Sequence, residues 1–256
     1  QVLRADKWDV IALGCITTAY RSIKHIVKMA RAMCPDSLIV LGGGVLTSLP
    51  HEVMRWLPEV DLGVVGEGFR SFPEILRRID SSPGRAYTTE RIVPGDVIGT
   101  VVPHGGGTYL TPPAPLLDDL DSLPYPAWDL FPLDIYFKNS MALYSEEGML
   151  ARRRLDINAS YGCSLICRFC FHLGIAGDLE QNGQDVSFGY KRTIRYHSPR
   201  YIVTLVKYIR DKYGVDFIGF LDENLMTMHQ SSGKTWLTDI CRLWIEEGLQ
   251  PQCVQD

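Results

Sequence analysis

Three cysteines lie close together past the middle of the chain, at Cys163, Cys167 and Cys170. They follow a run at 155–160 whose pattern predicts a strand. Thiolates are soft ligands that select zinc, copper(I) or iron–sulfur clusters. A 4Fe-4S cluster normally takes four cysteines, one for each iron. Three cysteines would therefore leave one iron open to bind and activate another molecule.

Two simpler interpretations compete with a cluster. One is a structural zinc site with His172 as the fourth ligand. Such sites usually pair two short clips, whereas this sequence has one group of three cysteines and no second clip. The other is a set of buried free thiols, which are common. Three cysteines packed this closely after a predicted strand favour the cluster.

The residues after 150 predict the opening of a β/α barrel. The strand at 155–160 is followed by a glycine- and polar-rich stretch at 174–190, which predicts a flexible loop. A helix at 198–214 comes next, with Ser198 as N-cap and Gly214 at its end. A strand at 215–221 and a helix at 232–247 complete the pattern. The active sites of such barrels lie at the carboxyl ends of the strands.

Two acidic residues, Asp222 and Glu223, stand at the end of the second of these strands. A carboxylate suits a positively charged ligand, because its hydrogen bond to an ammonium group is strong in a partly dry pocket. A surface turn is the alternative interpretation.

The first part of the chain predicts a doubly wound α/β sheet. Continuous apolar runs at 9–14, 38–41 and 62–65 indicate strands covered on both faces. Between the first two runs lies the apolar stripe of a half-buried helix, with Thr17 or Thr18 as its cap. The alternation of strands and helices argues for parallel strands.

Glycine turns follow two of these strands. They comprise Gly42, Gly43, Gly44, Gly66 and Gly68, with Glu67 between the last two. Ligands of open α/β sheets bind at this edge, and glycine lets the backbone approach a ligand closely. Tight turns between strand and helix explain the same residues. They do not form the G-x-G-x-x-G pattern of a dinucleotide site.

Between these two parts, prolines are dense from 83 to 132 and disfavour regular helix and sheet. Short runs at 98–102 and 108–110 are consistent with a small hairpin. Residues 118–130 predict an extended strap that packs Trp128, with no chemistry assigned to it.

Composition excludes several classes of protein. The 256 residues carry a net charge of −4 and no long run of Lys or Arg, so we expect no nucleic-acid partner. No signal peptide or membrane-spanning apolar run is visible, and no membrane partner is expected. Seven cysteines without a disulfide framework predict a reducing, cytoplasmic location.

The cysteine motif resembles that of the radical S-adenosyl-L-methionine (SAM) enzymes. In that family three such cysteines hold a 4Fe-4S cluster, and SAM chelates the fourth iron. Phe169 fits the aromatic residue before the last cysteine, whereas Ser164 replaces a frequent proline. The resemblance implies that the cluster ligands are Cys163, Cys167 and Cys170. It also implies that Asp222 and Glu223 hold the SAM amino group, and that backbone near Phe171 and His172 meets the adenine.

The first part resembles the cobalamin-binding domain that precedes many radical SAM domains. The resemblance rests on 40–44, 49–50, 58–61 and 66–68, and on the strap at 118–130. It implies a cobalamin pocket lined by Gly42, Gly43, Gly44, Gly66, Glu67 and Gly68. The expected division is a cobalamin-binding-like Rossmann domain at 1–80, a connector at 81–150, and the start of a radical SAM barrel at 151–256.

The same resemblance implies that segments are missing at both ends, so that the isolated chain would not turn over. Trp236 and Trp244 would then lack part of their covering, which favours aggregation. The favoured activity is radical C-methylation or a related C–H functionalisation, on an unknown small-molecule or peptide substrate, with no catalytic residue assigned. An electron donor such as flavodoxin or ferredoxin is the expected partner. Alternatives are a methylthiotransferase, for which Cys15 and Cys34 do not supply a second cysteine set, and a non-catalytic zinc-stabilised module.

Overall fold

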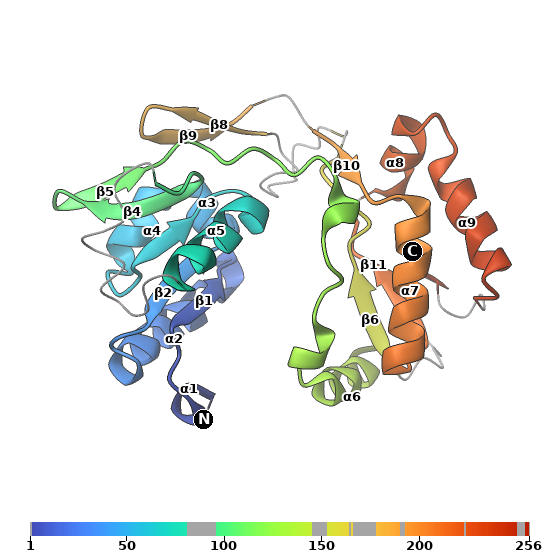
Figure 1. Ribbon diagram of the computed structural model, residues 1–256, viewed down its shortest axis with the longest axis horizontal. Coiled ribbons are helices and arrows are strands. Elements are labelled where there is room, and N and C mark those ends of the chain that lie inside the picture. Colours follow the sequence, from blue (N-terminus) through green and yellow to red (C-terminus); the bar gives the residue numbers. More distant parts are fainter. Residues whose placement is uncertain are drawn as a thin grey trace. The chain divides into compact units, whose positions relative to one another are not determined.

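The computed structural model describes residues 2–80, 96–144, 153–163, 165, 178–189, 193–222, 224–249 and 254–255 (Figure 1). The chain forms two compact units. The first contains Gln1–Leu117 and Ile166–Arg192, and the second contains Asp118–Leu165 and Thr193–Asp256. Among the described residues, no helix is long and apolar enough to cross a membrane.

The first unit is built on a five-stranded sheet in the order β1-β2-β3-β4-β5. Its parallel part consists of β1 (Val10–Gly14), β2 (Leu38–Gly42) and β3 (Leu62–Val64). The antiparallel strands β4 (Thr100–His104) and β5 (Gly107–Leu110) complete the sheet and form the hairpin expected from the two runs around Gly105–Gly107.

Helices cover both faces of this sheet, as the apolar strand pattern requires. The helical segments are α1 (Val2–Ala5), a 3₁₀ turn η1 (Thr17–Ala19), α2 (Tyr20–Met33), α3 (Gly44–Ser48), α4 (Pro50–Trp56) and α5 (Gly68–Asp80). Ile39 and Leu41 of β2 pack in a cluster with residues of α2, α3 and α4, while Leu38 and Val40 pack in another with residues of α5. The prediction of a doubly wound α/β sheet is confirmed.

The expected threonine cap of α2 is wrong. Thr17 and Thr18 lie inside the preceding 3₁₀ turn, and Ala19 occupies the N-cap position without a side-chain hydrogen bond. Helical backbone begins at Thr17, directly after Ile16, which is three residues before the start of α2.

A hairpin replaces part of the flexible loop predicted for 174–190. It consists of β8 (Leu179–Asn182) and β9 (Asp185–Phe188), paired antiparallel. Leu179 and Val186 pack against the core of the first unit, although the hairpin follows the cysteine motif in sequence. The loop prediction was wrong here because apolar residues alternate with the polar ones. These apolar residues pack against the core of the first unit, which is distant in sequence.

The second unit contains the parallel sheet β12-β11-β6. Its strands are β6 (Arg154–Ile157), β11 (Phe217–Phe220) and β12 (Val254–Gln255). Beside it, β7 (Ser160–Tyr161) pairs antiparallel with β10 (Arg195–Tyr196). The helical segments are η3 (Leu120–Ser122), η4 (Trp128–Leu130), α6 (Leu133–Tyr144), α7 (Pro199–Tyr213), α8 (Leu225–Ser231) and α9 (Trp236–Glu246).

Helix α7 has the ends that its sequence predicts. The Ser198 hydroxyl accepts a hydrogen bond from the Tyr201 N–H, and Pro199 occupies the first turn. Gly214 ends the helix in the left-handed region at φ 62°. Helix α9 instead begins at Trp236, four residues later than expected, because Gly233 and Lys234 adopt positive φ.

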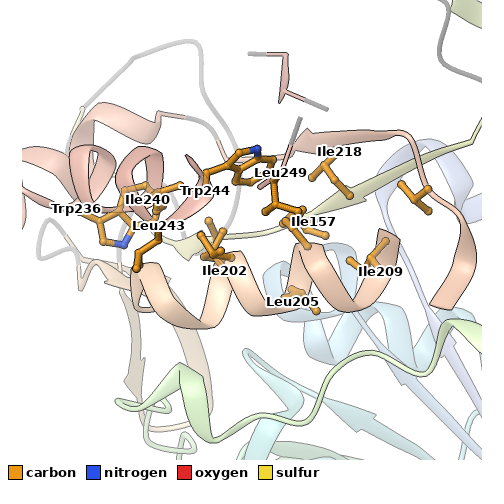
Figure 2. Packing of buried hydrophobic residues seen from close by; sticks show 14 of the residues in the cluster. Ile157, Ile202, Leu205, Ile209, Ile218, Trp236, Ile240, Leu243, Trp244 and Leu249 are labelled. Carbon is orange, nitrogen blue, oxygen red and sulfur yellow. The ribbon is translucent and has the colours of Figure 1, made fainter. Parts of the chain in front are cut away.

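The core of the second unit packs α7 and α9 over β6 and β11 (Figure 2). Trp236 is 1% exposed and Trp244 is 6% exposed. The expectation that these two residues would lack covering is therefore wrong for this chain. Both belong to one buried cluster with residues of α7, β6 and β11.

The expected boundaries at 80 and 150 differ from those of the compact units. The β4–β5 hairpin belongs to the first unit because it extends its sheet. From Asp118 onward the predicted connector packs with the second unit, and Trp128 and Phe137 join its core.

Candidate functional site

Cys163 is the cluster-motif cysteine that the structure describes. It lies two residues after the end of β7, is 6% exposed, and its Sγ accepts a hydrogen bond from the Leu165 N–H at 3.5 Å. Gly162 before it has φ +101°, and a Cβ atom there would lie 2.7 Å from the Thr193 oxygen. The pairing of β7 with β10 thus requires glycine immediately before the first cysteine.

Several predicted site residues lie outside the described residues: Cys167, Cys170, Phe171, His172 and Glu223. Among the described residues, no three His, Cys, Asp or Glu side chains gather as a metal ion would require. The donor set fits a cluster by its chemistry, since Cys163 is buried at the start of a motif that supplies two more thiolates.

Asp222 lies after β11 and reaches back to the segment that leads into the cysteines. Its Oδ2 accepts a hydrogen bond from the Ala159 N–H at 2.9 Å, and its Oδ1 accepts one from the Ser160 hydroxyl. Burial raises the pKa of Asp222, and these hydrogen bonds oppose the rise. The carboxylate therefore anchors the chain four residues before Cys163, a role that the sequence did not indicate.

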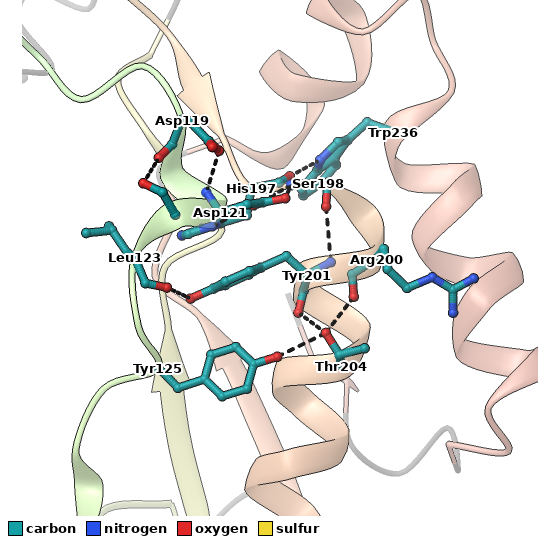
Figure 3. A network of polar contacts seen from close by, with 11 residues as sticks. Asp119, Asp121, Leu123, Tyr125, His197, Ser198, Arg200, Tyr201, Thr204 and Trp236 are labelled. Atoms are coloured by element: carbon teal, nitrogen blue, oxygen red, sulfur yellow. Dashed lines mark hydrogen bonds and ion pairs between the residues drawn. The ribbon is translucent and has the colours of Figure 1, made fainter.

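A second polar network holds the start of α7 (Figure 3). Asp121 accepts a hydrogen bond from the Ser198 N–H at 3.0 Å, and its Oδ1 lies 3.1 Å from Nδ1 of His197. The His197 ring stacks on Tyr201 with centroids 4.1 Å apart, and its carbonyl accepts a hydrogen bond from Trp236 Nε1. Burial lowers the pKa of His197, while Asp121, Asp222 and Asp119 oppose the shift.

This network connects the strap to the motif segment. The His197 N–H donates to the Ala159 oxygen at 2.9 Å, next to the Ala159 N–H that Asp222 binds. We assigned no chemistry to the strap from sequence, and Asp121 was missed. Two features of the sequence could have indicated Asp121: an acidic residue in the strap, and a helix at Ser198 whose start is buried.

The glycine turns of the first sheet differ in their surroundings. Gly43 has φ +94°, and a Cβ there would lie 2.7 Å from the Cys15 oxygen and 2.8 Å from the Cys15 nitrogen. At Gly42 the nearest atom would be 3.9 Å away, and at Gly14 nothing lies within 4 Å. Gly43 thus serves the packing of the turn, a Cβ at Gly42 would be in ordinary contact with Val64, and Gly14 leaves open space at the end of β1.

The second turn is held by a threonine of α3. The Gly66 N–H, at φ +79°, donates to Thr47 Oγ1 at 3.0 Å. Gly44 and Gly68 begin α3 and α5, and Glu67 is half-buried. Together with the open space beside Gly14, the exposed Gly66 allows a large ligand such as cobalamin to approach the backbone at this edge.

Residues 1–76 match the family described as B12 binding domain. The chain is 26% identical over 215 residues to an uncharacterised methyltransferase of Pyrococcus horikoshii, covering 84% of this chain and 39% of that protein. It is 29% identical over 163 residues to the cobalamin-dependent radical SAM methyltransferase TokK of Streptomyces tokunonensis, covering 63% of this chain and 22% of that protein. The chain thus spans less than half the length of these relatives.

The fold is similar to that of the apo form of the cobalamin-dependent SAM radical enzyme OxsB. The TM-score is 0.58 at 16% identity, covering 94% of this chain and 29% of that one. Residues 1–76 thus match a B12 binding domain, and the chain is similar in sequence to the named methyltransferases and in fold to this cobalamin-dependent enzyme.

Proposed function

We propose that this chain is part of a radical SAM enzyme that uses cobalamin for C-methylation or a related C–H functionalisation. The observation that carries the proposal is the position of Cys163. It is buried two residues after β7, and Asp222 is hydrogen-bonded to Ser160 at the start of β7 and to Ala159 before it. Two relatives named as methyltransferases support methyl transfer as the reaction class.

Cys163, Cys167 and Cys170 would hold a 4Fe-4S cluster. When bound, the cluster would supply the electron that cleaves SAM, and cobalamin would supply the methyl carrier. Gly162 and Asp222 keep the first cysteine at the strand end by fixing the backbone on either side of β7. Burial of Cys163 limits access of water to that thiolate.

The SAM ammonium would be held by Asp222 and Glu223, and backbone near Phe171 and His172 would meet the adenine. Asp222 accepts two hydrogen bonds from Ala159 and Ser160, and each carboxylate oxygen can accept more than one. One carboxylate can therefore anchor the motif segment and still bind a cation.

Cobalamin would lie against the carboxyl edge of the first sheet. Gly42, Gly66 and Gly68 would let the corrin approach the backbone, with Gly44 and Glu67 beside them. Gly43 has a separate reason to be glycine, since it packs on Cys15. An electron donor such as flavodoxin or ferredoxin would reduce the cluster, in a reducing cytoplasm.

Anaerobic reconstitution followed by iron, sulfide and zinc analysis tests the cluster. We expect about four irons and four sulfides per chain, and loss of the cluster in Cys163→Ala, because one of three anchors is removed. Cys241→Ala, which changes an exposed cysteine of α9, is the matched control and should keep the cluster. Zinc without sulfide, or a normal cluster in Cys163→Ala, would overturn the proposal.

Binding of SAM to the reconstituted chain tests the carboxylates. The double variant Asp222→Asn with Glu223→Gln should weaken SAM binding by about 1.5–3 kcal/mol, roughly 10- to 150-fold, because charged hydrogen bonds are lost. The amide at 222 can still accept from the Ala159 N–H and donate to the Ser160 oxygen, so the anchor survives. Unchanged affinity would mean that Asp222 and Glu223 do not bind SAM and that Asp222 only anchors the motif segment.

A further inference from the structure

The strap at 118–130 is joined to the start of α7 at three points (Figure 3). Three strap residues make these contacts, each with one residue of α7 or its cap: Asp121 with Ser198, Leu123 with Tyr201, and Tyr125 with Thr204. The contact at Asp121 differs from the other two, because Asp121 Oδ1 also lies 3.1 Å from Nδ1 of His197. The Asp121 carboxylate therefore holds two consecutive residues, at the point where β10 passes into α7.

His197 is restrained at its ring and at its backbone. A carboxylate oxygen accepts hydrogen bonds, so Nδ1 of the ring carries the proton that points at Asp121. The ring stacks on Tyr201 with an interplanar angle of 8°, and the backbone oxygen accepts a hydrogen bond from Trp236 Nε1 at 2.8 Å. Tyr201 and Trp236 belong to helices of the core, so Asp121 supplies the contact through which the strap reaches His197.

The backbone of His197 passes this restraint to the segment that leads into the cysteines. Its N–H donates to the Ala159 oxygen at 2.9 Å, one residue beyond the pairing of β7 with β10. On the other side of the same residue, the Ala159 N–H donates to Asp222 Oδ2 at 2.9 Å. Asp121 is thus connected to Asp222 through His197 and Ala159, and all four residues belong to the second unit.

Burial makes these connected contacts sensitive to displacement. Ala159 is 0% exposed and His197 is 5% exposed, so water cannot take the place of a lost partner. If His197 moved, the Ala159 oxygen would lose its donor, and the N–H that orients the Asp222 carboxylate would shift with it. In metal sites, removal of a residue that orients a ligand-binding group commonly weakens binding by about 10- to 100-fold. The geometry therefore makes the Asp222 carboxylate depend on a residue of the strap.

We propose that Asp121 is a positioning residue for the SAM-binding carboxylate of Asp222. The inference rests on the proposed function, because it requires Asp222 to bind the SAM ammonium. Asp121 acts through His197 and Ala159. The strap thereby takes part in cofactor binding, in addition to packing Trp128 in the core.

The first test needs no cofactor. In Asp121→Ala, exchange of the Ala159 amide hydrogen should become about tenfold faster, measured against the Ile209 amide inside α7, which reports overall opening. Asp129→Ala is the matched control, because the Asp129 carboxylate accepts from the Tyr213 hydroxyl at the other end of α7. It should leave exchange at Ala159 unchanged. Equal exchange at Ala159 in all three proteins would overturn the inference.

The second test measures SAM affinity by titration of the reconstituted chain at equal iron content. Asp121→Ala should weaken SAM binding by about tenfold, because the Asp222 carboxylate is no longer held in place. Asp129→Ala should bind SAM as the unmodified chain does. Unchanged affinity in loaded Asp121→Ala would overturn the inference, whereas failure of the unmodified chain to bind a cluster or SAM would overturn the proposed function instead.

Asp121→Asn separates positioning from charge. Its amide oxygen can accept from both the Ser198 N–H and Nδ1 of His197, so most of the SAM affinity that is lost in Asp121→Ala should return. A loss as large as in Asp121→Ala would show that the charge of Asp121 acts on SAM, and would overturn the positioning role.

If Asp121→Ala does not fold, His197→Phe provides the second variant. It keeps a ring that can stack on Tyr201 and the backbone N–H that binds Ala159, and it removes the contact between Nδ1 and Asp121. SAM affinity should fall by less than in Asp121→Ala, because Asp121 still holds Ser198. Full affinity in loaded His197→Phe would then overturn the inference.

Discussion

The parallel strands of the two sheets end in different chemical groups. At the carboxyl edge of the first, the turns depend on glycine backbone. Gly43 packs on the Cys15 backbone, and the Gly66 N–H donates to Thr47. At the corresponding edge of the second, the carboxylate of Asp222 binds Ala159 and Ser160 and fixes the approach to the cysteines.

This difference matches what each edge would have to hold. A large corrin ring needs an open backbone surface to lie against, and side chains at the strand ends would obstruct that surface. A cluster and a charged methionyl group need ligands and charge, which only side chains supply. Under the proposed function, the first sheet would present glycine backbone to cobalamin, and the second would present a carboxylate to SAM.

The largest effect is expected at the first edge. Gly43→Ala should lower the free energy of unfolding by about 3 kcal/mol, because positive φ and contact with the Cys15 backbone both oppose a Cβ. Gly42→Ala is the control and should change it by less than about 1 kcal/mol, since the nearest atom is 3.9 Å away. Urea unfolding measures both. Similar losses in the two variants would remove the distinction between packing and ligand-facing glycines.

At the second edge, Asp222→Ala should cost about 2 kcal/mol, because it leaves the Ala159 N–H and the Ser160 hydroxyl without their acceptor. It should also reduce iron loading on reconstitution. Asp216→Ala is a matched control, because Asp216 accepts from the Arg153 N–H before β11, away from the cysteines. We expect it to lose stability and keep iron. Full iron loading in Asp222→Ala would show that the anchor does not support the motif.

The pH dependence of stability sharpens the role of Asp222. Burial raises its pKa, so the folded state favours the protonated acid. Its contribution to stability is fully present below the ordinary Asp pKa and is lost as the pH rises through the raised value. The side chain in Asp222→Asn does not ionise, so the stability of this variant lacks the pH-dependent loss. The stability of the unmodified apo chain relative to Asp222→Asn should therefore fall from pH 4 to pH 7 in urea titrations, and a constant difference would contradict the shift.

The smallest effect concerns His197, whose pKa burial lowers although Asp121, Asp222 and Asp119 oppose the shift. Because its pKa is lowered, its contribution is present above the ordinary pKa of about 6.5 and is lost as the pH falls through the lowered value. His197→Gln has no charge to gain. Between pH 7.5 and 5.5 the melting temperature of the unmodified apo chain should fall more than that of the variant. An equal fall in the melting temperature of the two proteins would show that protonation of His197 does not change their stability.

The sequence by itself determined the elements whose causes are local. Ser198 and Gly214 predicted both ends of α7, since caps depend on residues within one turn. Apolar runs predicted the parallel strands, and the spacing of Cys163, Cys167 and Cys170 predicted the kind of ligand. Of the predicted site residues, Cys163 lies two residues after β7 and Asp222 lies two residues after β11, and their predicted roles stay predictions.

Tertiary structure decided which of these residues meet. Asp222 binds Ala159 across 63 residues, and Gln184 binds Leu110 across 74. Such pairs depend on the order of strands in a sheet and on which core a hairpin finds, and no local pattern encodes either. The hairpin therefore looked like a loop, and Trp236 and Trp244 looked uncovered. For Gly43 the sequence suggested a ligand pocket, and Cys15, brought beside it by the pairing of β1 with β2, supplies a second physical reason for its glycine.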